Sequence, residues 1–307
     1  MNSLPFAFMR NSRDAIPGIA FSAIRGSGWS ERLMGATVRL FGMGLLLATA
    51  ACTTYQPSNT PESIIESALS SSVQLFTERE DGRRRTGSGV VFAQEGERSY
   101  IVTTAHLLEP QMSQKVFVSL PGHTARTEAR ILTVSADKDI ALLETLPLGA
   151  TPVRFQDDAR LGENIWVVSF PWGRRVTVVN GFVSQVADSQ DDTASLTHGP
   201  ISLIDATVSY GTSGGGVFNG ATGNLLGIVR GYRTAKLSVP GGNGQSLSVP
   251  IAGETTVIPI SDIRCQLKDA RLAHLALENN DWINIAGRDD ACPKMTASNP
   301  GIAKAAN

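Results

Sequence analysis

The chain has 307 residues, of which 42% are hydrophobic and 18% charged. This composition is typical of a globular protein, and the length exceeds that of most single hydrophobic cores. The formal net charge is −1 and no stretch is strongly basic or acidic, which argues against nucleic acid as a partner. The three cysteines contain no C-x-x-C pair and the four histidines are scattered, so we expect no metal and no cofactor.

The N-terminal part of the chain has the features of a targeting segment. Residues 40–51 form an apolar run of 12 residues preceded by Arg39. A membrane-spanning helix needs about 20 residues, whereas a run of this length is typical of a signal peptide. Small residues stand directly before Cys52, which resembles the lipobox of bacterial lipoproteins, although Thr49 departs from the usual aliphatic residue. The alternative is an ordinary signal peptide followed by a coincidental cysteine.

The lipobox resemblance implies a targeting segment over residues 1–51, a lipidated Cys52 and a polar tether over residues 52–60. A start at Met34 would give a leader of 18 residues, so we expect translation to begin there. Thr53, in place of an aspartate, implies sorting to the outer membrane. The sequence thus predicts a periplasm-facing lipoprotein of the bacterial cell envelope, held at the membrane by an N-terminal lipid anchor.

Beyond the tether we expect one short helix followed by strands. Thr60 and Pro61 are typical of an N-cap and a first helical position, and apolar residues from Ile64 to Leu69 lie on one helix face. Short alternating stretches between turn residues then predict a first series of strands at residues 72–77, 87–93, 99–104, 115–119, 128–135 and 141–144.

A second series of strands follows a linker at residues 146–149. These strands are expected at residues 164–170, 175–186, 202–206, 216–218, 225–230, 246–249 and 256–260. Two sets of about six strands favour an all-β chain with two antiparallel six-stranded barrels. The first barrel and the N-terminal helix would occupy residues 61–150, and the second barrel residues 151–262. A helix capped by Ser261 and Asp262 and running to about Glu278 would belong to a C-terminal segment, residues 263–307.

If Cys52 is lipidated, two unmodified cysteines remain, Cys265 and Cys292. In an oxidising envelope compartment they are candidates for a disulfide. A bond between residues 27 positions apart would stabilise the fold by roughly 3 kcal/mol. Two free thiols are equally compatible with the sequence.

Three motifs in order carry the residue types of Ser-His-Asp hydrolysis. They are T-A-H ending at His106, D-I-A-L-L beginning at Asp139, and G-T-S-G-G centred on Ser213. A serine nucleophile needs a general base, and that base needs a third group that fixes its tautomer. The glycines around Ser213 permit the backbone conformations that would aim the N–H groups of Gly211 and Ser213 at an oxyanion.

These motifs, together with the G-S-G-V-V-F strand at residues 87–92 and the run at residues 205–215, resemble the HtrA/trypsin-like serine peptidases. The resemblance covers about residues 73–263 and implies a chymotrypsin-like fold. It implies that His106 is the general base, Asp139 its orienting partner and Ser213 the nucleophile, with protein or peptide substrates.

Two competing interpretations are weaker. Asp137 also precedes the strand, but only Asp139 is followed directly by the I-A-L-L of the family motif. The G-x-S-x-G pattern also fits the nucleophile turn of α/β-hydrolases, which require an acid and then a histidine after the serine. Only His274 follows Ser213, and it lies in the expected terminal helix.

Some residues depart from the family pattern. Thr212 stands where digestive-type enzymes have an aspartate that pairs with a new N-terminus, so we expect no zymogen activation of that type. Gly216 stands where the family usually has proline. About 44 residues follow residue 263, too few for the PDZ domain that HtrA proteins usually carry, so we expect no PDZ domain.

The resemblance also places a substrate pocket. Thr207 and Val208 lie where the family lines the primary pocket, and Ile228, Val229 and Arg230 form the strand opposite. No acidic residue occurs among them, which argues against a preference for lysine or arginine and favours a small or medium apolar side chain. We expect Arg230 to face solvent.

The sequence therefore predicts a serine endopeptidase of the cell envelope that acts through an acyl-enzyme. The alternative is a catalytically silent or ligand-gated peptide-binding module on the same fold, because an oxyanion loop can rest in an inactive state.

Overall fold

The computed structural model describes residues 60–109, 114–187, 197–238, 246–276 and Cys292, all of which belong to one compact unit, Pro57–Asn307. The predicted targeting segment, the alternative start at Met34 and the lipidation site Cys52 lie outside these residues. No helix within the described ranges is long and apolar enough to cross a membrane.

Helix α2 (Pro61–Ser71) begins as the sequence predicts. The Thr60 hydroxyl accepts a hydrogen bond of 3.3 Å from the Ser63 N–H, and Pro61 occupies the first helical turn. Ile64 and Ala68 are buried, so the predicted apolar face packs against the rest of the fold.

The first six strands form a closed antiparallel barrel. In spatial order β1-β2-β3-β6-β5-β4, it consists of β1 (Ser72–Arg79), β2 (Arg84–Glu95), β3 (Arg98–Thr104), β4 (Gln114–Ser119), β5 (Thr127–Ser135) and β6 (Ile140–Thr145). All six strands were predicted, and β1–β4 pairing closes the barrel. Alternating residues such as Leu75, Ile101 and Leu143 fill its interior.

A second closed antiparallel barrel follows, in the order β11-β14-β13-β12-β8-β9. Its strands are β8 (Asn164–Ser169), β9 (Thr177–Val186), β11 (Ile201–Asp205), β12 (Gly216–Asn219), β13 (Leu225–Ser238) and β14 (Ser246–Pro259). A small separate sheet pairs β7 (Ala159–Arg160) with β10 (His198–Gly199). The predicted all-β fold with two six-stranded barrels is confirmed.

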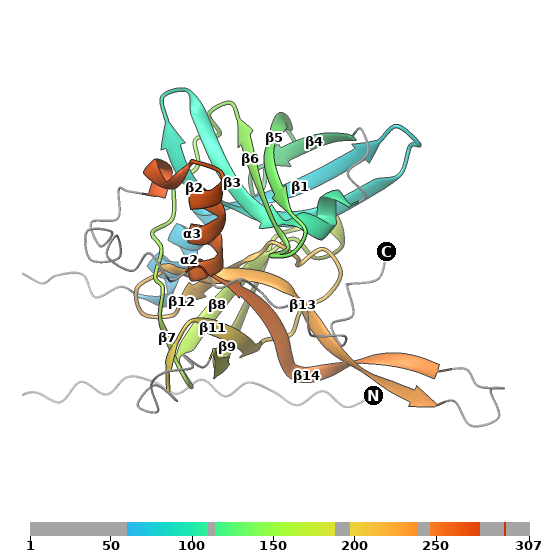
Figure 1. The fold of residues 1–307 in the computed structure, drawn as a ribbon, viewed down its shortest axis with the longest axis vertical. Coiled ribbons are helices and arrows are strands. Elements are labelled where there is room, and N and C mark those ends of the chain that lie inside the picture. The colour runs from blue at the N-terminus through green and yellow to red at the C-terminus, as the bar shows by residue number, and fades with distance from the viewer. Residues whose placement is uncertain (1–59, 110–113, 188–196, 239–245, 277–291, 293–307) are drawn as a thin grey trace, which may run out of the picture. The chain divides into compact units, whose positions relative to one another are not determined.

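Two details of the second barrel differ from the prediction. The expected strands at 246–249 and 256–260 are a single strand, β14, and β13 runs on to Ser238. The two strands pair as far as Ser238 opposite Ser246. Shifts in register along the pairing accommodate residues that have no partner on the opposite strand. Figure 1 shows this hairpin projecting from the barrel.

The C-terminal helix is also shorter than predicted. Helix α3 (Ile260–Asp269) has Pro259 at its N-cap, so Ser261 and Asp262 lie inside the first turn rather than before it. The helix ends at Ala270 because Arg271 adopts a positive φ of 60°, and a short 3-10 helix, η4 (Ala273–Ala276), follows.

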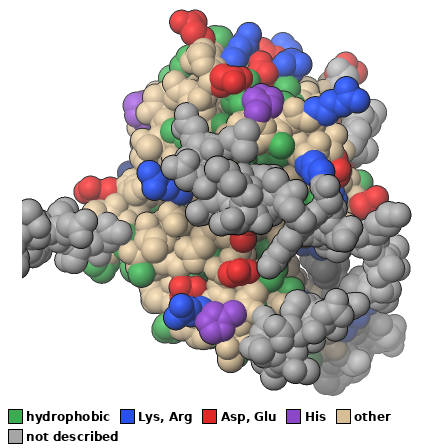
Figure 2. Space-filling model, turned by 60° about the vertical axis from the view of Figure 1, so that its left-hand side comes forward, with side chains coloured by type: hydrophobic (Ala, Val, Ile, Leu, Met, Phe, Trp, Pro, Cys, Tyr) green, Lys and Arg blue, Asp and Glu red, His purple; other side chains and the backbone are tan. Residues whose placement is uncertain are grey.

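The two barrels share one hydrophobic cluster. Val90, Val102, Ile140 and Leu142 of the first barrel pack together with Val168, Phe218, Ile228 and Ile258 of the second, and with Ile263 and Leu267 of α3. Barrel docking is therefore part of core formation. On the described part of the face in Figure 2, acidic and basic side chains are interspersed.

Helix α3 is tied to Cys292 by a disulfide from Cys265, with Cα atoms 5.6 Å apart. Cys265 itself is buried. The bond closes a loop between residues 27 positions apart, so it restricts the unfolded chain.

We expect Cys292→Ser to lower the free energy of unfolding by about 3.5 kcal/mol, the loop-closure value for a bond of this separation. Chemical denaturation with and without reductant measures the change. Reductant should destabilise the wild type and leave Cys292→Ser unchanged; a wild type insensitive to reductant would contradict the prediction.

Candidate active site

His106 is positioned by the end of β3. The strand stops at Thr104 and a short 3-10 helix, η1 (Ala105–Leu108), follows, whose own residues Leu107 and Leu108 are buried. The guanidinium of Arg85 on β2 donates to the carbonyls of His106 at 3.0 Å and Glu109 at 2.8 Å. The His106 carbonyl also accepts the Glu109 N–H at 3.3 Å, so the guanidinium adds a second hydrogen bond and a favourable charge at the carbonyl end of this turn.

Asp139 faces His106 from the turn before β6. Its backbone has a positive φ of 58°, a conformation that aspartate tolerates better than most residues. One carboxylate oxygen accepts the His106 backbone N–H at 2.9 Å, and both lie 3.0–3.1 Å from the imidazole Nδ1. Because the carboxylate accepts at Nδ1, Nε2 is left as the basic nitrogen of a neutral imidazole. Asp137 is exposed.

The charge on Asp139 is stabilised by its neighbours. Burial alone would raise the pKa of the Asp139 carboxyl, but hydrogen bonds from His106, the charge that the His106 ring carries when protonated, and the charge of Arg230 hold this pKa below its usual value. Arg230 Nε lies 3.3 Å from an Asp139 oxygen. The expectation that Arg230 faces solvent is wrong, because its guanidinium is attracted into this contact and its side chain is only 27% exposed.

A second carboxylate lies near Arg230. Burial raises the pKa of Asp262 in α3, and the charges of Lys138 and Arg230 oppose this rise. Lys138 in turn contacts Asp269 of the same helix at 2.6 Å. The C-terminal helix thus contributes charges to the surroundings of Asp139.

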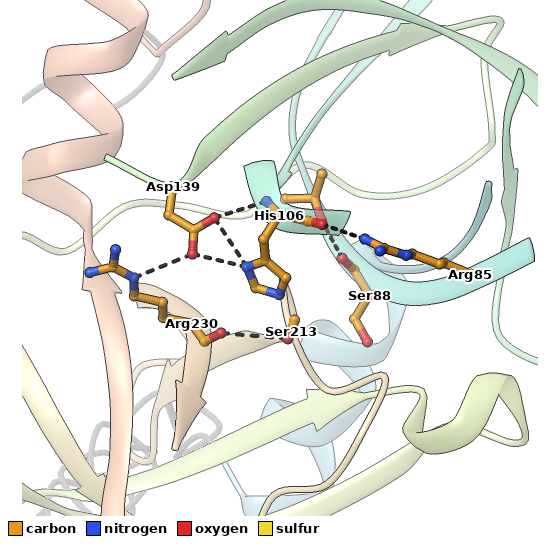
Figure 3. A network of polar contacts seen from close by, with 7 residues as sticks. Arg85, Ser88, His106, Asp139, Ser213 and Arg230 are labelled. Atoms are coloured by element: carbon orange, nitrogen blue, oxygen red, sulfur yellow. Dashed lines mark hydrogen bonds and ion pairs between the residues drawn. The ribbon is translucent and has the colours of Figure 1, made fainter. Parts of the chain in front are cut away.

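Ser213 reaches the site from the second barrel, in the turn before β12. The imidazole of His106 lies between Asp139 and Ser213 (Figure 3). In this ligand-free arrangement the Ser213 hydroxyl donates to the Arg230 carbonyl at 3.5 Å rather than to His106. Catalytic hydrogen bonds often form only when substrate binds, so this orientation of the Ser213 hydroxyl is compatible with a nucleophile and base pair.

The backbone of the loop 209–215 is anchored at four successive carbonyls. The Tyr210 carbonyl accepts the Trp172 N–H at 2.7 Å and the Thr212 carbonyl accepts the Gly215 N–H at 2.8 Å. The carbonyls of Gly211 and Ser213 are both held by Ser88. Gly211 has a positive φ of 89°, which favours glycine at this position.

Within the described residues, three N–H groups of this loop have no protein acceptor, those of Tyr210, Gly211 and Ser213, and the last two belong to the predicted oxyanion site. A trans peptide places its N–H opposite its carbonyl. These two groups therefore point away from the anchors of Tyr210 and Thr212, as an oxyanion site requires.

The residues expected to line the substrate pocket differ in how far their side chains are exposed. Thr207 is exposed and Val208 is half-buried against the second core. Ile228 and Val229 are fully buried, in the shared cluster and the second-barrel core respectively. Their side chains cannot line an open pocket, because hydrophobic packing fixes them inward; Val229 instead uses its backbone to hold Gly214 and Gly215.

No group of three His, Cys, Asp or Glu side chains within the described ranges is arranged to hold a metal ion. The remaining histidines, His123, His198 and His274, are exposed.

The fold is that of the two-barrel serine peptidases, and comparisons with known proteins agree. Residues 87–228 match the model of the trypsin-like peptidase domain. The chain is 32% identical over 178 residues to the serine protease Do-like HtrA of Bacillus subtilis (strain 168), covering 56% of this chain and 38% of that protein. It is 30% identical over 176 residues to a serine protease HtrA-like of Staphylococcus aureus (strain USA300), covering 54% and 22%.

Solved structures show the same fold. The HtrA-type protease AlgW with tripeptide has a TM-score of 0.52 and 21% identity, over 70% of this chain and 64% of that one. Rv3671c from M. tuberculosis H37Rv, in an inactive form, has a TM-score of 0.50 and 20% identity, over 70% and 94%. The chain contains a trypsin-like peptidase domain related to the HtrA serine proteases. It spans less than half the length of these two sequence relatives.

The lowered pKa of Asp139 predicts that the contribution of this residue to the free energy of unfolding depends on pH. A carboxyl whose pKa is lowered by folding stabilises the fold at pH values above its pKa in the unfolded chain, which is about 3.9. This contribution is lost as the pH falls through the pKa of the same group in the folded protein. We expect Asp139→Asn to lower the free energy of unfolding more at pH 7 than at pH 3. Denaturation at both pH values tests this, with the exposed Asp137→Asn as matched control; equal losses for Asp139→Asn would contradict it.

Proposed function

We propose that the chain is a serine endopeptidase that hydrolyses peptide bonds through a covalent acyl-enzyme. Ser213 is the nucleophile, His106 the general base and Asp139 the group that orients the imidazole. The observation that carries the proposal is the placement of His106, whose Nδ1 is bound by Asp139 while the ring lies beside Ser213. Its substrates are proteins or peptides of the bacterial cell envelope.

The geometry supports a two-step reaction. The imidazole Nε2 takes the proton of the Ser213 hydroxyl as Oγ attacks the scissile carbonyl, and Asp139 stabilises the imidazolium that forms. The N–H groups of Gly211 and Ser213 donate to the developing oxyanion; one such donor contributes about 2.7–4 kcal/mol. His106 then gives the proton to the leaving amine. Water activated by the same nitrogen hydrolyses the ester and restores Ser213.

A second candidate is a ligand-gated or catalytically silent peptide-binding module. One observation favours it, namely that the Ser213 hydroxyl donates to the Arg230 carbonyl and not to His106. In a gated enzyme, substrate would turn the hydroxyl to the imidazole; in a silent one, it would not. The reactivity of Ser213 toward a covalent probe distinguishes both of these from a peptidase that is active without added ligand.

Labelling with a fluorophosphonate probe tests the nucleophile. The probe should lose fluoride and form a phosphorus–oxygen bond to Ser213 in the wild type. We expect Ser213→Ala to abolish labelling and His106→Ala to slow it by several orders of magnitude, because the residues act as a unit. Ser209→Ala, in the same loop, is the matched control and should label normally. Labelling that survives Ser213→Ala would defeat the proposal, and a wild type reactive only with added peptide would favour gating.

We further propose that the mature protein is a lipoprotein anchored through Cys52, with its peptidase domain facing the periplasm at the outer membrane. The support is the apolar run ending in small residues before this cysteine. Metabolic labelling with an alkyne fatty acid should mark the wild type and not Cys52→Ser, and the wild type should sediment with membranes. Labelling of Cys52→Ser equal to that of the wild type would contradict this.

A further inference from the structure

We propose that Ser88, a residue of the first barrel, is the positioning residue that holds the oxyanion loop of the second barrel in its donor conformation before substrate binds. The inference rests on the proposed function and concerns what orients the N–H groups of the oxyanion site before substrate binds. Ser88 lies in β2 and is only 1% exposed. Figure 3 shows Ser88 and Arg230 on either side of Ser213.

The hydroxyl, N–H and carbonyl of Ser88 make four hydrogen bonds, and three of these bonds join the first barrel to the second. Its hydroxyl donates to the Gly211 carbonyl at 2.8 Å and accepts the Phe170 N–H at 2.9 Å. Its backbone N–H donates to the Ser213 carbonyl at 2.9 Å. Its carbonyl accepts the Thr103 hydroxyl at 2.7 Å, which secures Ser88 within its own barrel.

These contacts control the peptide groups that form the oxyanion site. The Gly211 N–H belongs to the peptide that Trp172 anchors through the Tyr210 carbonyl, and the next peptide is anchored by the Ser88 hydroxyl. The same hydroxyl holds Phe170, two residues before Trp172. One hydroxyl thus supports both anchors, and a rotation that turns the Gly211 N–H away must strain or break one of them.

The close approach of the loop to Ser88 reinforces the constraint. A Cβ at Gly214 would come within 2.1 Å of the Ser88 carbonyl oxygen, so glycine is needed for the loop to pack here. Thr212 replaces the aspartate that an activating N-terminal amine would hold. Its side chain instead accepts the Ser209 N–H within the loop. The Ser88 hydroxyl provides an anchor for the loop that needs no cleavage of the chain.

The test replaces Ser88 with alanine in the full chain and measures hydrolysis of a chromogenic peptide ester. Loss of one oxyanion donor lowers kcat by about 10²–10³-fold, so a loop released by Ser88→Ala should lose at least tenfold in kcat with little change in KM. Affinity for a peptide boronate, whose adduct carries the oxyanion, should fall by a similar factor. Ser88→Cys, with a weaker donor, should fall between alanine and wild type and provides a second variant if Ser88→Ala does not fold.

Ser119→Ala is the matched control. Ser119 is a buried serine of the same barrel whose hydroxyl donates to the His123 carbonyl at 2.8 Å. It should lose similar stability and keep the wild-type kcat. Wild-type kcat in folded Ser88→Ala or Ser88→Cys, or an equal loss of kcat in Ser119→Ala, would overturn the inference. Failure of the proposed function is distinguished because it would appear first as a wild type without Ser213-dependent activity.

Discussion

Docking of the two barrels is the constraint on which the site depends. His106 and Asp139 come from the first barrel and Ser213 from the second, so the three side chains meet only when the barrels share their hydrophobic cluster. Hydrophobic burial supplies the energy of this contact but sets positions only loosely. The directional hydrogen bonds of Ser88 between the two barrels fix the loop 209–215 relative to the first barrel.

Charge around Asp139 extends the site beyond the three residues. Arg230 contacts Asp139 and lies near Asp262 of α3, while Lys138, next to Asp139 in sequence, contacts Asp269 of the same helix. The disulfide from Cys265 holds that helix to Cys292. Arg230 therefore links the charges of the C-terminal helix to Asp139, in addition to the packing of that helix against both barrels.

Much of the fold could be predicted from the sequence because strands of alternating pattern between turn residues identify themselves locally. The six strands of the first barrel and the cap of α2 are of this kind. The single long β14 was missed because its middle residues have no regular alternation, and its pairing with β13 is what makes it a strand. Helix α3 ends where Arg271 adopts a positive φ, and the sequence has no glycine or asparagine at this position to predict the end.

The candidate site was predictable in part. The T-A-H, D-I-A-L-L and G-T-S-G-G motifs indicated the residues that the structure brings together. Side-chain direction was not predictable: Ile228 and Val229 point into the cores, and Arg230 turns to Asp139. The roles of Ser88 and Arg85 were missed because both contact carbonyls distant in sequence, although the glycines around Ser88 signalled close backbone approach.

The most direct test of the account is a crystal structure of the protein with a peptide boronate. We expect a covalent bond from boron to Ser213 Oγ and a boronate oxygen about 2.7–3.1 Å from the N–H groups of Gly211 and Ser213. The Ser88 contacts to Gly211 and Phe170 should be unchanged from the ligand-free protein. A ligand bound without the covalent bond, or a loop whose Gly211 N–H points away from the boronate, would contradict it.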